Sequence, residues 1–114
     1  MLEIGAIVWG VRHLNRAINF WSEALNYKLK REPDVDFAIL IPKEGEGIQL
    51  SLNAAVTSDK PKRHHIDLFT HDQINEVERL IKLGAIRVKW NYDAEADYVV
   101  LSDPDGNTFC VVQI

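Results

Sequence analysis

The sequence contains one cysteine, Cys110, and fewer basic residues than acidic ones, with 13 Lys and Arg against 17 Asp and Glu. A single thiol excludes an intrachain disulfide and a cysteine-rich zinc site. The net charge of −4 argues against nucleic acid as a partner, because binding phosphates needs a concentrated basic surface. No apolar run is long enough to cross a bilayer, and the N-terminal residues lack a secretory signal pattern. We therefore expect a cytoplasmic protein with neither a membrane nor a nucleic acid as its partner.

The hydrophobic pattern of the first half predicts one strand, one helix and three further strands. The predicted strands are residues 4–11, 27–30, 36–41 and 48–52. Between the first two strands, apolar residues recur at helical spacing, and Asn26 follows as a C-terminal cap. The residues of this apolar helix face are Leu14, Ala17, Ile18, Trp21 and Leu25. Trp9, Phe20 and Trp21 are expected to pack between the helix and the sheet.

The second half repeats this order of elements. Its predicted strands are residues 64–70, 86–90, 98–101 and 108–114. Asp72 is placed to cap the start of the second helix, and Gly84 is placed to end it. The apolar face of this helix is predicted to consist of Ile74, Val77 and Ile81.

These patterns give the order βαβββ twice, in one domain that covers residues 1–114. The two modules are residues 1–53 and 63–114, and the polar residues 54–62 form a linker. One helix in each module can cover one face of its strands and leaves the other face free. The sequence therefore predicts an α+β fold in which two βαβββ modules form an open mixed sheet around a cup.

Four segments carry a resemblance to a known family: FWSEALNYKL, HIDL, LGA and DPDGNTFCV. Together with the duplicated βαβββ order, they resemble the vicinal oxygen chelate superfamily. This superfamily includes glyoxalase I, extradiol dioxygenases, and the fosfomycin- and bleomycin-resistance proteins. The resemblance extends over essentially the whole chain and is closest to the small glyoxalase-like members. It implies a homodimer and a ligand site inside the cup.

Enzymes of this superfamily hold a divalent metal at four positions, which the resemblance places at Ala6, Gln49, His65 and Cys110. The internal duplication agrees, because it aligns Ala6 with His65 and Gln49 with Cys110. The usual residues there are His and Glu; alanine cannot bind a metal, and a glutamine oxygen is a weak ligand. We therefore expect no metal cofactor. If a divalent metal does bind, the resemblance gives His65, Cys110 and Gln49 as its ligands, a set better suited to zinc or copper.

The segment HHIDLFTHD, residues 64–72, contains three of the four histidines. Because neighbouring strand residues point to opposite faces, His64 and His65 cannot bind one ion together. His65 and Asp67 share a face, where they could form an acid–base pair or bind a polar group. The alternatives are a purely structural His65 and a solvated Asp67. Cys110 could equally be a small buried hydrophobic residue.

These residues predict a protein that binds a small organic molecule, without the metal site of the superfamily. The residues expected to supply its polar contacts are Gln49, Ser51, His65, Asp67 and Cys110. Candidates for an apolar wall or an interface are Phe37, Trp90 and Tyr98. One alternative is a metal-dependent lyase, isomerase or dioxygenase of the same superfamily. A metal-free enzyme would use His65 and Asp67 as its acid–base pair, and a structural dimer with a non-functional cup is a further alternative.

Overall fold

A computed structural model describes residues 1–54 and 64–114, so the predicted linker at 54–62 falls almost wholly outside the described residues. Within these residues no helix is long and apolar enough to cross a membrane. The elements confirm an α+β fold with a mixed, eight-stranded sheet built from two βαβββ modules.

The chain divides into two compact units. Residues Ala6–His64 form the N-terminal unit, and Met1–Gly5 join His65–Ile114 in the C-terminal unit. The first strand therefore contributes residues to both units.

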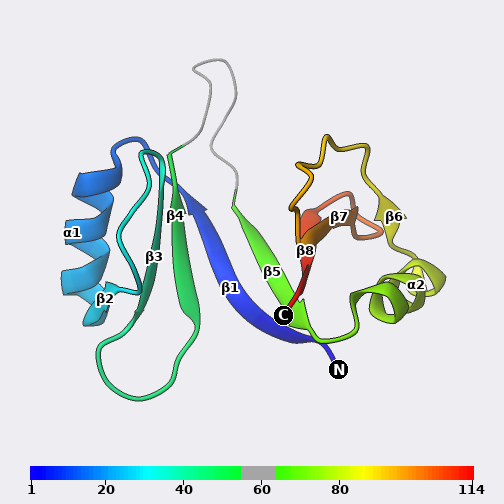
Figure 1. The fold of residues 1–114 in the computed structure, drawn as a ribbon, viewed down its shortest axis with the longest axis horizontal. Coiled ribbons are helices and arrows are strands. Elements are labelled where there is room, and N and C mark those ends of the chain that lie inside the picture. The colour runs from blue at the N-terminus through cyan, green and yellow to red at the C-terminus, as the bar shows by residue number, and fades with distance from the viewer. Residues whose placement is uncertain (55–63) are drawn as a thin grey trace. The chain divides into compact units, whose positions relative to one another are not determined.

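The N-terminal unit has one helix against one face of its strands (Figure 1). Its elements are β1 (Glu3–Gly10), α1 (Leu14–Leu25), β2 (Tyr27–Leu29), β3 (Phe37–Pro42) and β4 (Gln49–Asn53). The strand order is β2-β3-β4-β1. In this order β1 is parallel to β4, whereas the other pairs are antiparallel.

The core of the N-terminal unit lies between α1 and the strands β3 and β4. Leu40 and Leu52 are fully buried there. Trp9 and Trp21 pack against this core as predicted, edge to face at 6.3 Å between ring centroids. The prediction for Phe20 was wrong, because its side chain is 62% exposed. Phe20 reaches only the outer side of Trp21, with 5.1 Å between the ring centroids.

Asn26 ends α1, as its position predicts. Its φ of 56° lies in the left-handed region, and its backbone N–H donates to the carbonyl oxygen of Ser22. Asparagine tolerates this conformation better than most residues other than glycine.

The C-terminal unit repeats the arrangement. Its elements are β5 (His65–Thr70), α2 (Gln73–Leu83), β6 (Ile86–Arg87), β7 (Tyr98–Ser102) and β8 (Thr108–Gln113). The strand order is β5-β8-β7-β6. In this order β5 is parallel to β8, and the remaining pairs are antiparallel. The strand predicted over residues 86–90 is thus only two residues long.

The helix α2 packs on β7 and β8 through a face that only partly matches the predicted one, with Val77 in common. Val77 is buried against Leu101 and Val111, with Leu80 beside them. Ile74 is 74% exposed and Ile81 is 37% exposed. Two of the three predicted face residues therefore point away from the core, because contact with the sheet, rather than hydrophobicity alone, decides the orientation of a short helix.

Asp72 precedes α2, as predicted, but does not cap it in the expected way. Its side chain makes no capping hydrogen bond to the backbone. Its Oδ2 atom instead accepts a hydrogen bond of 2.8 Å from the side-chain amide of Asn75.

Gly5 of β1 lies against the aromatic ring of Phe69 in β5, and both residues belong to the C-terminal unit. A Cβ atom at position 5 would overlap the ring. The strand can therefore approach Phe69 only because position 5 has no side chain.

We predict that Gly5→Ala lowers the free energy of unfolding by about 1–3 kcal/mol, since overpacking costs that much in a tight contact. Chemical denaturation measures the change. The same substitution in a Phe69→Ala background should cost clearly less, because the ring that it meets is gone. Equal costs in the two backgrounds would show that the contact is not the cause.

Candidate functional site

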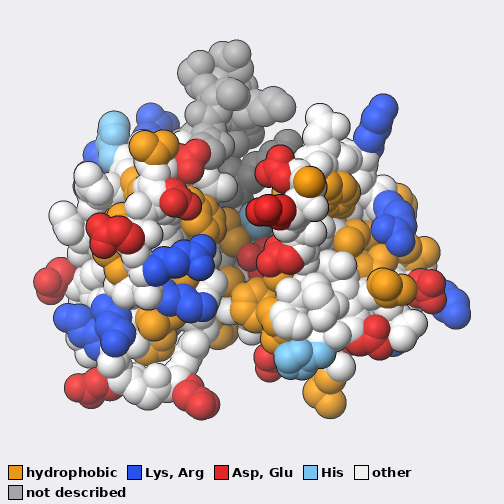
Figure 2. Space-filling view, in the orientation of Figure 1, with side chains coloured by type: hydrophobic (Ala, Val, Ile, Leu, Met, Phe, Trp, Pro, Cys, Tyr) orange, Lys and Arg blue, Asp and Glu red, His pale blue; other side chains and the backbone are white. Residues whose placement is uncertain are grey.

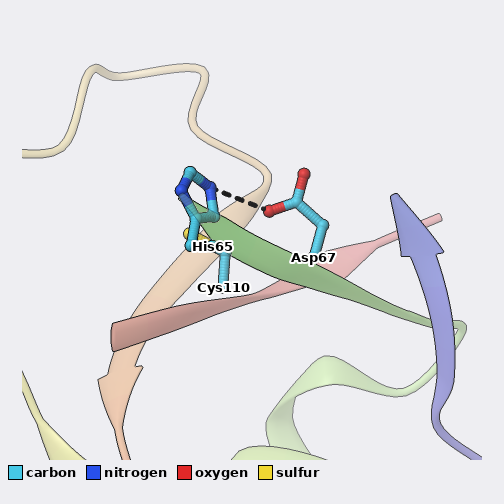
Figure 3. Close-up of side chains that lie close together, drawn as sticks. All are labelled: His65, Asp67 and Cys110. Carbon is cyan, nitrogen blue, oxygen red and sulfur yellow. Dashed lines mark ion pairs between the residues drawn. The ribbon is translucent and has the colours of Figure 1, made fainter. Parts of the chain in front are cut away.

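Parallel pairing of β5 with β8 brings His65, Asp67 and Cys110 together (Figure 3). Asp67 lies opposite Cys110 in the register. His65 precedes Asp67 by two residues, so the three side chains share one face of the strands. A ring nitrogen, a carboxylate oxygen and the sulfur lie within 4.8 Å of one another. The next residue after Cys110, Val111, packs on the α2 side, and we therefore call the opposite side the helix-free face.

His65 and Asp67 form a direct pair. The distance from His65 Nε2 to Asp67 Oδ1 is 3.3 Å, and the side chains are 27% and 21% exposed. A carboxylate oxygen only accepts, so this contact favours the tautomer with hydrogen on Nε2 and leaves Nδ1 as an acceptor. Among the residues that the structure describes, Asp67 has no ion pair with Lys or Arg. Among these residues, its polar partners in the site are the imidazole of His65 and the thiol of Cys110.

Cys110 is a poor nucleophile in this setting. Burial raises the pKa of its thiol to about 12, helped by the negative charge of Asp67 and by a hydrogen bond to that carboxylate. The thiol is therefore neutral at physiological pH and donates its hydrogen to Asp67. Cys110 is therefore an unreactive thiol in the absence of a metal.

Gln49 and Ser51 lie in β4 of the N-terminal unit, whereas His65, Asp67 and Cys110 belong to the C-terminal unit. Ser51 is only 2% exposed. The side-chain oxygen of Gln49 accepts a hydrogen bond of 3.4 Å from Lys30 Nζ. Ala6, the strand neighbour of Gln49, is fully buried. This half of the superfamily's metal set therefore offers one neutral oxygen that already faces an ammonium group, and it does not suit a divalent cation.

The registers of the two modules explain why sequence alignment did not point to Asp67 as a metal ligand. In the first module Ala6 lies opposite Gln49. The internal duplication would place His65 opposite Cys110, but the residue opposite Cys110 is Asp67. The pairing in the second module is thus offset by two residues. This offset adds a third donor beside the two that the resemblance named.

An aromatic group lies further along the helix-free face. Tyr98 pairs with Val112, which is two residues beyond Cys110 and therefore on the same face. The indole N–H of Trp90 donates to the Tyr98 hydroxyl at 3.3 Å, and the ring of Tyr92 lies 5.5 Å from that of Tyr98. Tyr92 was not predicted; its only sequence signal was its spacing from Trp90 and Tyr98.

The start of β7, where Tyr98 lies, borders a shallow hollow of about 520 Å³ that is lined by residues 93–98. Three of these six residues are acidic: Asp93, Glu95 and Asp97. Figure 2 shows Asp and Glu side chains gathered along one side of the C-terminal unit. This side of the unit is therefore electrostatically favourable to cations and unfavourable to polyanions.

His64 contacts the first strand of the N-terminal unit rather than the site of His65. Its ring stacks on Trp9, with 3.8 Å between the centroids and 9° between the planes. Its Nδ1 atom accepts a hydrogen bond of 3.1 Å from the backbone N–H of Gly10. His64 and His65 thus serve different purposes although they are neighbours.

Residues 6–112 match the model of the glyoxalase-like domain family. The chain belongs to this family. That membership confirms the resemblance to the glyoxalase, bleomycin-resistance and dioxygenase superfamily. A comparison with curated proteins found no significant match.

Solved structures of the same fold have low sequence identity to this glyoxalase-like chain. A superfamily member from Vibrio splendidus 12B01 is 15% identical, with a TM-score of 0.68 and all of both chains covered. A methylmalonyl-CoA epimerase in complex with methylmalonyl-CoA is 15% identical, with a TM-score of 0.73, and 99% of this chain and 94% of that chain are covered. The epimerase from Mycobacterium tuberculosis is 18% identical, with a TM-score of 0.66 and coverage of 96% and 86%. At these identities the likeness establishes the fold alone.

We predict that Cys110 of the folded, metal-free protein reacts very slowly with iodoacetamide at pH 8. The reason is that a thiol of pKa about 12 is only about one part in ten thousand in the reactive thiolate form at this pH. Its rate should still be rising at pH 9 to 10, where an ordinary thiol levels off. Mass spectrometry measures the alkylation, with denatured protein as the reference.

The substitution Asp67→Asn should increase this rate, because the charge of Asp67 raises the pKa of the thiol. Glu78→Gln removes an exposed charge from α2 and should leave the rate unchanged. Rapid alkylation of the folded wild type at pH 8 would contradict the assigned environment of Cys110.

Proposed function

We propose that this chain binds a small organic molecule on the helix-free face of its C-terminal unit. The observation that carries the proposal is the contact between His65 and Asp67, which places an imidazole and a carboxylate at 3.3 Å while leaving both partly exposed. Together they offer one acceptor nitrogen and up to two free acceptor lone pairs of the carboxylate, or one strong donor when the imidazole is protonated. A carbonyl, carboxylate or hydroxyl group of a ligand would fit such a pair.

The aromatic side chains supply the other property of a small-molecule site. Ligand sites combine an apolar wall with a few polar groups that set the orientation. Trp90 and Tyr92 are 51% and 44% exposed and connect to Tyr98 on the same face. An aromatic or branched aliphatic group of the ligand would pack on these rings.

The four-position metal site of the superfamily is not part of this proposal, because Ala6 and Gln49 do not suit a divalent cation. The contribution of Gln49 and Ser51 to the same ligand stays a prediction, as do the homodimer and the cytoplasmic location. An enzyme that used the same site would transfer a proton between His65 and the bound ligand. The orienting carboxylate that such a histidine requires is Asp67.

We predict that a fragment screen by ¹H–¹⁵N NMR, run with a chelator present, finds ligands that shift the resonances of His65, Asp67 and Tyr98. The panel should include small carboxylates, aromatic acids and methylmalonyl-CoA, since an epimerase of this fold was solved with that thioester. His65→Ala should weaken the best ligand by about tenfold, which is the loss of one hydrogen bond to a charged or polar group.

His13→Ala provides the matched control, because His13 is an exposed histidine in the N-terminal unit with no capping hydrogen bond from its side chain. It should leave the affinity unchanged. A screen in which no fragment shifts these resonances, or in which His65→Ala binds the best ligand as tightly as wild type, would refute the proposed site.

A further inference from the structure

The three clustered side chains also have the donor chemistry of a metal site. His65, Asp67 and Cys110 offer one nitrogen, one oxygen and one sulfur from two adjacent strands. We propose that these three residues bind a zinc-class divalent ion, with all protein ligands supplied by the C-terminal unit. The inference deepens the proposed function, since the ion would share its site, but it does not depend on any small molecule being bound.

This donor set differs from the one that the superfamily implies. Only His65 and Cys110 occupy superfamily positions, and Asp67 replaces the contribution of the N-terminal unit. Imidazole with thiolate selects zinc, copper or cobalt over magnesium, calcium or manganese. Three protein ligands with a fourth position open are also the usual complement of catalytic zinc sites.

The geometry agrees with a tetrahedral ion. Zinc bond lengths of about 2.1 Å to nitrogen and oxygen and about 2.3 Å to sulfur imply edges of roughly 3.4 Å between N and O and roughly 3.6 Å to S. The separation of His65 Nε2 and Asp67 Oδ1 is 3.3 Å. The remaining separations are no larger than 4.8 Å. Side-chain rotations that shorten them by about 1 Å would bring all three ligand atoms to the spacing of a tetrahedral zinc site. On binding, the ion would take the place of the hydrogen on Nε2, with the ring hydrogen on Nδ1 and the thiol proton released to solvent.

The electrostatic setting favours a cation at this point. Within the described part of the chain, Asp67 has no Lys or Arg partner, and acidic side chains gather on the same unit (Figure 2). The ligands also stand on paired strands rather than on loops, which limits the movement needed to reach the ion. Lys30, the cation that faces Gln49, belongs to the other unit.

Cobalt(II) titration of chelator-stripped protein tests the inference, because thiolate ligation gives a charge-transfer absorption and tetrahedral geometry gives intense visible bands. We expect one equivalent to bind, with both signals, and zinc to displace it. The wild-type charge-transfer signal reports Cys110 directly, since the chain has no other cysteine. This readout needs no variant and no enzymatic activity.

Variants identify the remaining ligands. Cys110→Ser should abolish the charge-transfer band, and Asp67→Asn and His65→Ala should each weaken cobalt binding at least tenfold. Gln49→Ala should leave the affinity unchanged, which distinguishes this site from the superfamily's. Circular dichroism confirms that each variant is folded, and Cys110→Ala replaces Cys110→Ser if the serine variant is not.

Cobalt binding without a thiolate band would overturn the inference, and so would no saturable binding up to millimolar cobalt. An affinity lowered by Gln49→Ala but not by Asp67→Asn would favour the superfamily set and also overturn it. Because the fragment screen is run with a chelator, ligands that still bind there would preserve the proposed function when the metal site fails. Conversely, cobalt binding without any fragment would leave the metal site standing alone.

Discussion

The parallel pairing of β5 with β8 is the constraint on which the candidate site depends. It sets Asp67 beside Cys110, and the two-residue period of a strand then places His65 on the same face. The alternate residues go to the other face, where Leu101 and Val111 form the core with α2. A shift of the register by one residue would exchange these two sets. Burial of the apolar set therefore also fixes the positions of the three polar side chains.

Sequence patterns predicted the larger features of the fold because those features depend on periodicity and turn chemistry. The duplicated order of elements and the cap at Asn26 both follow from local rules. The errors concern side chains whose environment is set by tertiary contacts. Phe20 and Ile74 are apolar residues on amphipathic helices, yet each points outward. Helical spacing defines a stripe, and only packing decides which edge of the stripe meets the sheet.

The site was predicted in part for the same reason. Strand alternation was enough to place His65 and Asp67 on one face and His64 elsewhere. It could not reveal that Asp67, rather than His65, lies opposite Cys110, because register between strands distant in sequence is not a local property. Nor could it show that Lys30 faces Gln49. The departure from the superfamily's metal positions is thus visible in sequence, whereas the alternative donor set becomes visible only in three dimensions.

The most direct test of the account is the tautomer of His65 in the metal-free protein, measured by long-range ¹H–¹⁵N NMR at a pH where the ring is neutral. The contact with Asp67 predicts hydrogen on Nε2, with Nδ1 unprotonated. A ring protonated on Nδ1 instead would mean that Nε2 does not donate to Asp67. The hydrogen-bonded pair on which the proposed function is built would then not exist in the metal-free protein.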